Sequence, residues 1–130
     1  MDPTIENQSD VYTFASWNGT GSNKTKCGWF NNFCNNNSVA FAAIQEHFRI
    51  GKNTEKYFYN QFSDFRLHNT PAVRSELQTK GRASGGLLSL WRKNLKIETS
   101  LVSSCSNRIQ GQVLNISSRR ILWLNVYFLH

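Results

Sequence analysis

The sequence has few cysteines, and their spacing does not suit the common cysteine-based sites. Its three cysteines, Cys27, Cys34 and Cys105, include no Cys-x-x-Cys pair. This spacing argues against a zinc knuckle and against a disulfide framework. A reducing intracellular compartment therefore fits the chain best.

Long apolar segments are also missing. No stretch approaches the roughly 20 apolar residues that a membrane helix needs. The first six residues are acidic and polar, so they do not predict a secretory signal. With 130 residues and 39% hydrophobic side chains, the chain is expected to form one globular domain inside the cell, without a membrane partner.

Acidic side chains are scarce. The chain has 8 Asp and Glu against 15 Lys and Arg, which gives a formal net charge of +7. Residues 1–46 carry two basic and four acidic side chains, whereas residues 47–130 carry 13 basic and four acidic ones. A positive surface on this scale favours polyanionic partners, nucleic acid first.

The first part of the chain has the pattern of a βαβ unit. The pattern predicts a polar leader at residues 1–10, a strand at 11–17 and a Gly/Asn-rich turn at 18–22. An amphipathic helix at 24–35 and a second strand at 39–45 follow. The two strands of such a unit are parallel neighbours, and ligands bind outside their carboxyl ends. Asn18 and Glu46 follow these strands, so we expect them to face each other across one site.

The apolar run from Val39 to Ile44 predicts a strand buried on both faces, and it ends in Gln45-Glu46-His47. A carboxylate at the exit of a buried strand is held rigidly and is partly desolvated. Such a group suits a hard cation such as Mg2+. The alternative is that Glu46 only marks where the strand meets water.

The second part of the chain is rich in short β segments. A short helix is predicted around residues 54–59, a strand at 61–67, and a loop at 68–71. Four further strands are expected at residues 87–91, 97–102, 108–116 and 121–128, separated by polar turns. They predict an antiparallel meander, which together with the βαβ unit gives a mixed α/β sheet. The last strand is expected to be central in its sheet. It ends without a turn or a polar tail, so either the protein finishes on an exposed strand end or the chain is truncated.

Several motifs together resemble the endonuclease/exonuclease/phosphatase superfamily. In order they are residues 16–21 (SWNGTG), 44–47 (IQEH), 81–86 (GRASGG), 107–109 (NRI) and 125–128 (NVYF). The similarity is strongest to the endonuclease domains that precede reverse transcriptase in non-LTR retrotransposons. It implies that residues 11–130 form part of a DNase I-like α/β sandwich, namely its N-terminal half.

The resemblance also implies roles for individual residues. Asn18 would help to position the catalytic groups, Glu46 would bind Mg2+ or Mn2+, and Gln45 would support that site from behind. The Tyr127 hydroxyl would contact the scissile phosphate, and Arg82 is a candidate contact to DNA. The Asp, Asn and His motifs that complete the family's site lie beyond the tyrosine, and the usual proline after it is absent.

Other candidates have plainer explanations. His47 could support the metal site or belong to the loop, and we favour the loop; His68 is expected to be solvated. Gly85 and Gly86 are best explained by positive φ or close packing. The Trp and Phe side chains are assigned mainly to the core, because they follow the periodicity of the elements.

Three hypotheses about function result. The first is a fragment of a Mg2+-dependent endonuclease that nicks target DNA for retrotransposition, inactive alone, followed by the rest of a retroelement polyprotein and acting in the nucleus. The second is a basic nucleic-acid-binding module without chemistry. The third is a phosphoesterase of the same superfamily that acts on a small phosphoester or a lipid headgroup.

Overall fold

The computed structural model describes residues 11–74, 83–104 and 106–128. The predicted leader at residues 1–10 lies outside these ranges. The elements are β1 Thr13–Asn18, α2 Lys24–Asn36, β2 Val39–Gln45, α3 Thr54–Gln61, β3 Phe65–Thr70, β4 Leu87–Arg92, β5 Glu98–Val102, β6 Ile109–Ile116 and β7 Arg119–Val126. None of the helices in these ranges is long and apolar enough to cross a membrane.

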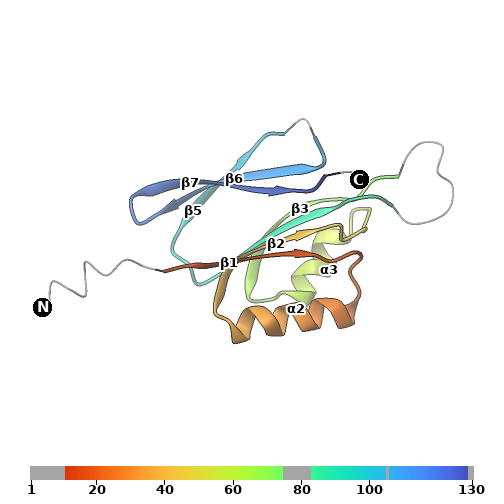
Figure 1. Ribbon diagram of the computed structural model, residues 1–130, viewed down its shortest axis with the longest axis horizontal. Coiled ribbons are helices and arrows are strands. Elements are labelled where there is room, and N and C mark those ends of the chain that lie inside the picture. The colour runs from red at the N-terminus through yellow and green to blue at the C-terminus, as the bar shows by residue number, and fades with distance from the viewer. Residues whose placement is uncertain (1–10, 75–82, 105, 129–130) are drawn as a thin grey trace, which may run out of the picture.

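The described residues form three layers (Figure 1). Helices α2 and α3 cover one face of a four-stranded sheet with the strand order β1-β2-β4-β3. A three-stranded sheet, β5-β6-β7, lies over the other face. The molecule is therefore a sandwich of two sheets with helices on one outer side.

The predicted βαβ unit is confirmed. Strands β1 and β2 are parallel, with Asn18 opposite Gln45, and α2 connects them. Asn23 caps the start of the helix: its side-chain Oδ1 accepts a hydrogen bond from the Lys26 backbone N–H at 2.8 Å. A polar N-cap of this kind satisfies one of the free N–H groups of the first turn.

All seven residues of β2 are buried, as the continuous apolar run predicted. One face packs against the helices through a core that includes Phe30, Ile44 and Phe58. Phe41, by contrast, packs against Leu114 of the second sheet. A strand covered on both faces and paired on both edges holds its exit residues rigidly, and Glu46 is the first of them.

The expected meander of four strands is wrong in one respect. Strand β4 belongs to the first sheet, between β2 and β3, and only β5, β6 and β7 form a meander. The physical reason is that β2 needs a partner on its second edge, and β4 supplies three fully buried leucines there. The last strand, β7, lies at the edge of its sheet and not at the centre, because two short hairpins make β6 the middle strand.

Two smaller expectations also change. The strand predicted at residues 61–67 begins later, at Phe65, because α3 extends to Gln61. His68 therefore lies on β3 and not in a loop. Trp29 and Phe33 widen the apolar stripe of α2, but they are 59% and 39% exposed, so they are not core residues.

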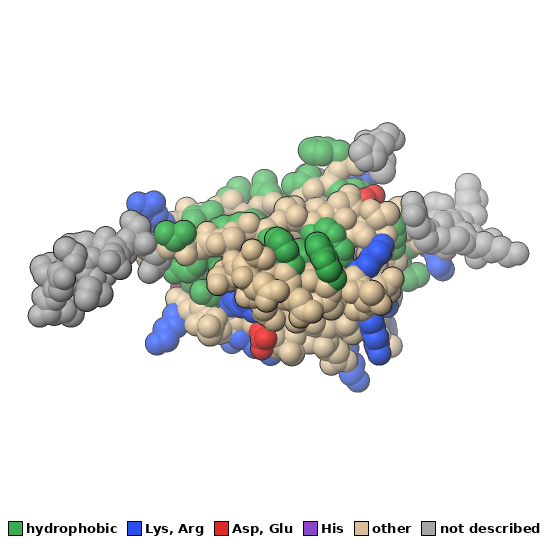
Figure 2. Space-filling view, turned by 60° about the horizontal axis from the view of Figure 1, so that its bottom comes forward, with side chains coloured by type: hydrophobic (Ala, Val, Ile, Leu, Met, Phe, Trp, Pro, Cys, Tyr) green, Lys and Arg blue, Asp and Glu red, His purple; other side chains and the backbone are tan. Residues whose placement is uncertain are grey.

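In the described part of the chain, the outer face of the second sheet is uncovered and largely apolar. Residues opposite one another on this face include Val113 with Leu122 and Gly111 with Leu124. Leu122 and Leu124 are 58% and 50% exposed. The helical side of the molecule is different: it is mostly polar, and lysine and arginine side chains surround it (Figure 2).

Candidate functional site

Four of the residues singled out in the sequence lie around one hollow. Its lining residues are Asn18, Gln45, Glu46, Val126, Tyr127 and Phe128, and its volume is about 200 Å3. We refer to it as the Glu46 hollow. Asn18 and Glu46 come from the carboxyl ends of two parallel strands, and Tyr127 comes from the end of β7 in the other sheet.

The loops after β1 and β2 are joined by backbone hydrogen bonds. Gly19 N donates to Gln45 O at 2.9 Å, and Gly21 N donates to Glu46 O at 2.8 Å. The Lys26 ammonium donates to the carbonyls of Gly19 and Thr20, at 3.2 and 2.9 Å. These bonds attach the first turn of α2 to the edge of the sheet that carries Glu46.

The backbone at this edge is strained. Thr20, Glu46 and Phe48 have φ angles of 43°, 57° and 60°. The left-handed region is unfavourable for residues with a Cβ, at a cost of about 1 kcal/mol or more each, and such residues cluster at functional sites. The strain turns the chain sharply at Glu46, directly after a rigid strand.

The Asn18 amide is anchored within its own loop. Its Oδ1 accepts hydrogen bonds from the Thr20 backbone N–H and from the Thr20 hydroxyl, both at 3.1 Å. This arrangement fixes the direction of the side chain at the rim of the hollow.

A buried hydrogen bond joins the two sheets directly behind Glu46. Gln45 Nε2 donates to Asn125 Oδ1 at 2.8 Å, and Asn125 Nδ2 donates to the carbonyls of Ile44 and Leu88 at 3.2 and 3.1 Å. Because Asn125 comes two residues before Tyr127, these bonds set the position of the tyrosine relative to β2.

The buried polar chain continues toward β3. Ser89 Oγ donates to Gln110 Oε1, and Gln110 Nε2 donates to the Thr70 hydroxyl at 3.1 Å and to the His68 carbonyl at 2.9 Å. Ser89 and Gln110 are each 2% exposed. Buried amides of this kind are costly unless they are bonded, so they specify how the sheets register.

His47 lies in the loop after β2, as we favoured from the sequence, but it is buried there, with 1% of its surface exposed. Its Nε2 donates to Asn69 Oδ1 at 2.9 Å, and its Nδ1 accepts from the Arg49 backbone N–H at 3.0 Å. Both bonds are satisfied by the neutral imidazole. Burial lowers the pKa of His47 from 6.5 to about 4, against the opposing effect of the Asn69 bond.

The two glycines at the start of β4 are required by close packing, as predicted. Gly85 and Gly86 have φ angles of 80° and 95°. A Cβ on Gly85 would overlap the Tyr127 hydroxyl, and a Cβ on Gly86 would overlap the His47 ring. Arg82, which precedes them in the same motif, lies outside the described residues.

The Glu46 hollow has the chemistry of a weak site for a hard cation. Among the described residues, no three His, Cys, Asp or Glu side chains come together in a cluster. Glu46 is the one carboxylate that lines the hollow. Mg2+ is commonly held by one or two carboxylates, several waters and substrate phosphates, so Glu46 fits as one ligand of a site that a phosphate completes.

The sequence analysis missed most of the supporting residues. Asn125 lies in a motif that was recognised, but its amide was given no role. Gln110 was overlooked because a buried glutamine in a strand looks the same as an exposed one. A usable signal was the alternation Gln110, Gln112, Leu114 on β6, which places polar groups on the same face as core residues.

Comparison with solved structures finds a similar fold in an AP endonuclease from Leishmania major. The match has a TM-score of 0.66 at 16% sequence identity, and it covers 98% of this chain and 41% of that chain. The predicted fold class, a partial α/β sandwich of the DNase I-like type, is thereby confirmed. This chain spans less than half the length of that protein. The sequence matches no family model and no curated protein.

Proposed function

We propose that this chain is the metal-binding first part of a Mg2+-dependent DNA endonuclease of the kind found in non-LTR retrotransposons. The observation that carries the proposal is the convergence of Asn18, Glu46 and Tyr127 on one hollow. The strained backbone at Glu46 and the basic charge of residues 47–130 support it.

The three side chains have distinct tasks in this proposal. The Glu46 carboxylate holds Mg2+ or Mn2+, which when bound would neutralise charge on the phosphate oxygens. The Tyr127 hydroxyl donates a hydrogen bond to the scissile phosphate. Asn18, whose amide is anchored by Thr20, orients the groups that approach from the β1 side.

The rest of the catalytic machinery is assigned to a following part of the protein. The family resemblance places the Asp, Asn and His motifs after Tyr127, and the AP endonuclease match leaves more than half of that chain unmatched. We therefore propose that a retroelement polyprotein supplies these motifs, and that the complete enzyme acts on DNA in the nucleus.

The metal dependence of DNA binding tests the role of Glu46. Anisotropy of a short fluorescein-labelled duplex is measured in millimolar Mg2+ and in EDTA. Mg2+ should lower the Kd for the duplex about tenfold, which corresponds to about 1.4 kcal/mol of metal-bridged contact. Glu46→Gln should remove that gain, because it removes the carboxylate that holds the metal. Glu98→Gln, which neutralises an exposed carboxylate on β5, should keep it. If Mg2+ tightened DNA binding by Glu46→Gln as much as it tightens binding by the wild type, the assignment of Glu46 as a metal ligand would be overturned.

The basic charge also favours a second candidate, a nucleic-acid-binding module without chemistry. That module would bind the duplex equally well in Mg2+ and in EDTA, with the steep salt dependence of phosphate contacts. A phosphoesterase for small substrates would bind the duplex in neither condition. The nucleotide sequence downstream of the His130 codon is an independent test: an open frame with Gly-Asp-x-Asn, Ser-Asp-His and then a polymerase supports the endonuclease.

A further inference from the structure

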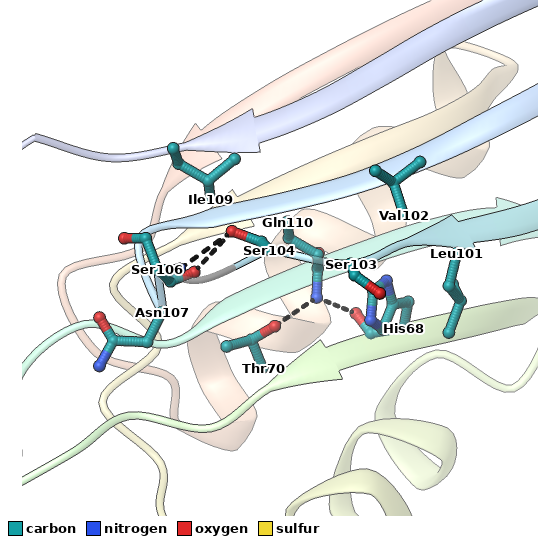
Figure 3. Close-up of a pocket in the computed structure, with 10 residues that line it drawn as sticks. All are labelled: His68, Thr70, Leu101, Val102, Ser103, Ser104, Ser106, Asn107, Ile109 and Gln110. Atoms are coloured by element: carbon teal, nitrogen blue, oxygen red, sulfur yellow. Dashed lines mark hydrogen bonds between the residues drawn. The ribbon is translucent and has the colours of Figure 1, made fainter.

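A second, larger hollow opens between β3 and the loop that joins β5 to β6. Its volume is about 470 Å3, which is within the usual range of small-ligand sites. His68 and Thr70 line it from β3, and Leu101 lines it from β5. Ser106 and Asn107 of the loop and Gln110 of β6 complete this part of the lining (Figure 3). We call it the His68 hollow.

The His68 hollow lies at the same edge of the sandwich as the Glu46 hollow. Thr70 pairs with Leu87, and Leu87 pairs with Gln45, so Thr70 and Gln45 lie in one row across three neighbouring strands. Strand spacing of about 4.8 Å puts them about 10 Å apart. The Tyr127 N–H also donates to the carbonyl of Arg108, whose two sequence neighbours line the His68 hollow.

The lining of this hollow is neutral and mixed. It carries hydroxyl, amide and imidazole groups beside the apolar side chains of Leu101 and Ile109, and no charged side chain among the described residues. Such a lining suits an uncharged, flat ligand that has apolar faces and hydrogen-bonding edges. It does not suit a phosphate or a metal ion.

Two polar side chains, His68 and Gln112, interact with each other beside this lining. In the described part of the chain, His68 Nδ1 and both amide atoms of Gln112 are buried without a well-formed hydrogen bond, and Gln112 is 1% exposed. Gln112 pairs with Leu101 of the lining. Burial lowers the pKa of His68, against the opposing effect of Gln112, and so favours the neutral imidazole. A neutral imidazole carries one donor and one acceptor nitrogen.

We propose that the His68 hollow binds an unpaired base of the DNA strand whose phosphate enters the Glu46 hollow. A nucleobase has the flat faces and the mixed donor and acceptor edge that this lining requires. The inference rests on the proposed function, because it takes the ligand to be the same DNA strand. The buried chain from Gln45 through Asn125 and Gln110 to Thr70 holds the two hollows in a fixed relation.

The test compares two fluorescein-labelled single strands of equal length that carry the same phosphates. One has a base at every position, and the other is abasic throughout. The wild-type chain should bind the first about tenfold more tightly than the second, as expected for one stacked base. Ser103→Trp should reduce this preference to about twofold or less, because it fills the hollow from an exposed lining position. His68→Phe keeps a ring but removes its nitrogens, and it should reduce the preference in part.

Ser100→Trp is the matched control, since Ser100 is exposed on β5 and is not part of the lining. It should leave the preference unchanged, and no variant should alter binding of the abasic strand. A full base preference in a folded Ser103→Trp variant would overturn the proposal. Equal binding of both strands by the wild type would overturn it while leaving the proposed function intact. Binding of neither strand would overturn both.

Discussion

Gln45 and Asn125 are 80 residues apart in the sequence and joined by a buried 2.8 Å hydrogen bond. Gln45 ends an inner strand of the first sheet, and Asn125 lies next to the end of an edge strand of the second sheet. This one contact determines that Glu46 and Tyr127, which follow these two residues, open into the same hollow. The site therefore depends on how two sheets dock.

Removing the Asn125 amide should destabilise the protein strongly. Asn125→Ala removes the hydrogen bond from Gln45 across the two sheets and the two bonds to the buried carbonyls of Ile44 and Leu88, so we expect a loss of about 2–3 kcal/mol in the free energy of unfolding. Urea denaturation followed by circular dichroism measures it. Asn115→Ala, on the uncovered face of β6, should cost less than about 0.5 kcal/mol. Similar losses in the two variants would contradict the role given to the inter-sheet bond.

Acid should destabilise the protein through His47. The unfolded chain binds this proton near pH 6.5 and the native state near pH 4. Stability from this group is therefore complete above pH 6.5 and is lost as the pH falls to 4, by at most about 3 kcal/mol. Denaturant titrations between these values should show the loss.

The variant His47→Gln should flatten that pH dependence. His68→Gln serves as the control. Burial also lowers the pKa of His68, so this variant should remove a smaller part of the pH dependence and leave the contribution of His47 in place. An unchanged slope in His47→Gln would show that other groups cause the acid sensitivity.

Two glycine-to-alanine substitutions should have opposite effects on the stability of the protein. Gly85→Ala places a Cβ against the Tyr127 hydroxyl at a positive φ, and it should cost about 2 kcal/mol or more. Gly28 lies in α2 with open space where a Cβ would be. Gly28→Ala should therefore stabilise the protein by about 0.5–1 kcal/mol. Thermal unfolding of both variants tests the pair, and a neutral Gly85→Ala would refute the close packing.

The uncovered face of the second sheet should make the isolated chain associate. Leu122 and Leu124 lie on this face in β7, an edge strand of the described sheet, so we expect poor solubility and binding of an apolar dye. Leu122→Lys with Leu124→Lys should reduce both effects. Trp29→Lys, which removes an equally exposed apolar side chain from the helical side, should not. A monodisperse wild-type monomer with a cooperative melt would count against this prediction.

The isolated chain should not nick plasmid DNA in Mg2+. It brings one carboxylate to the Glu46 hollow, and the groups that activate water are assigned to a following segment. Conversion of supercoiled to open-circular plasmid is the measurement. Robust Mg2+-dependent nicking that Glu46→Ala abolishes would show that the described residues suffice for catalysis.

Local patterns in the sequence were enough to predict the βαβ unit, its buried second strand and the meeting of Asn18 with Glu46. These features depend on residues that are close in the chain, where apolar periodicity and turn residues act directly. The need for glycine at Gly85 and Gly86 was also readable, because only a missing Cβ explains such a pair before a strand.

Only the tertiary structure decided how the strands divide between two sheets, and therefore what surrounds the site. The pattern of β4 suits either sheet, and it joined the first because β2 has a free edge that must be paired. The burial of His47 and the bonds of Asn125 and Gln110 follow from that division, since each depends on a partner more than 20 residues away. The sequence by itself determined which residues meet at the end of the βαβ unit; the docking of the second sheet determined that Tyr127 joins them.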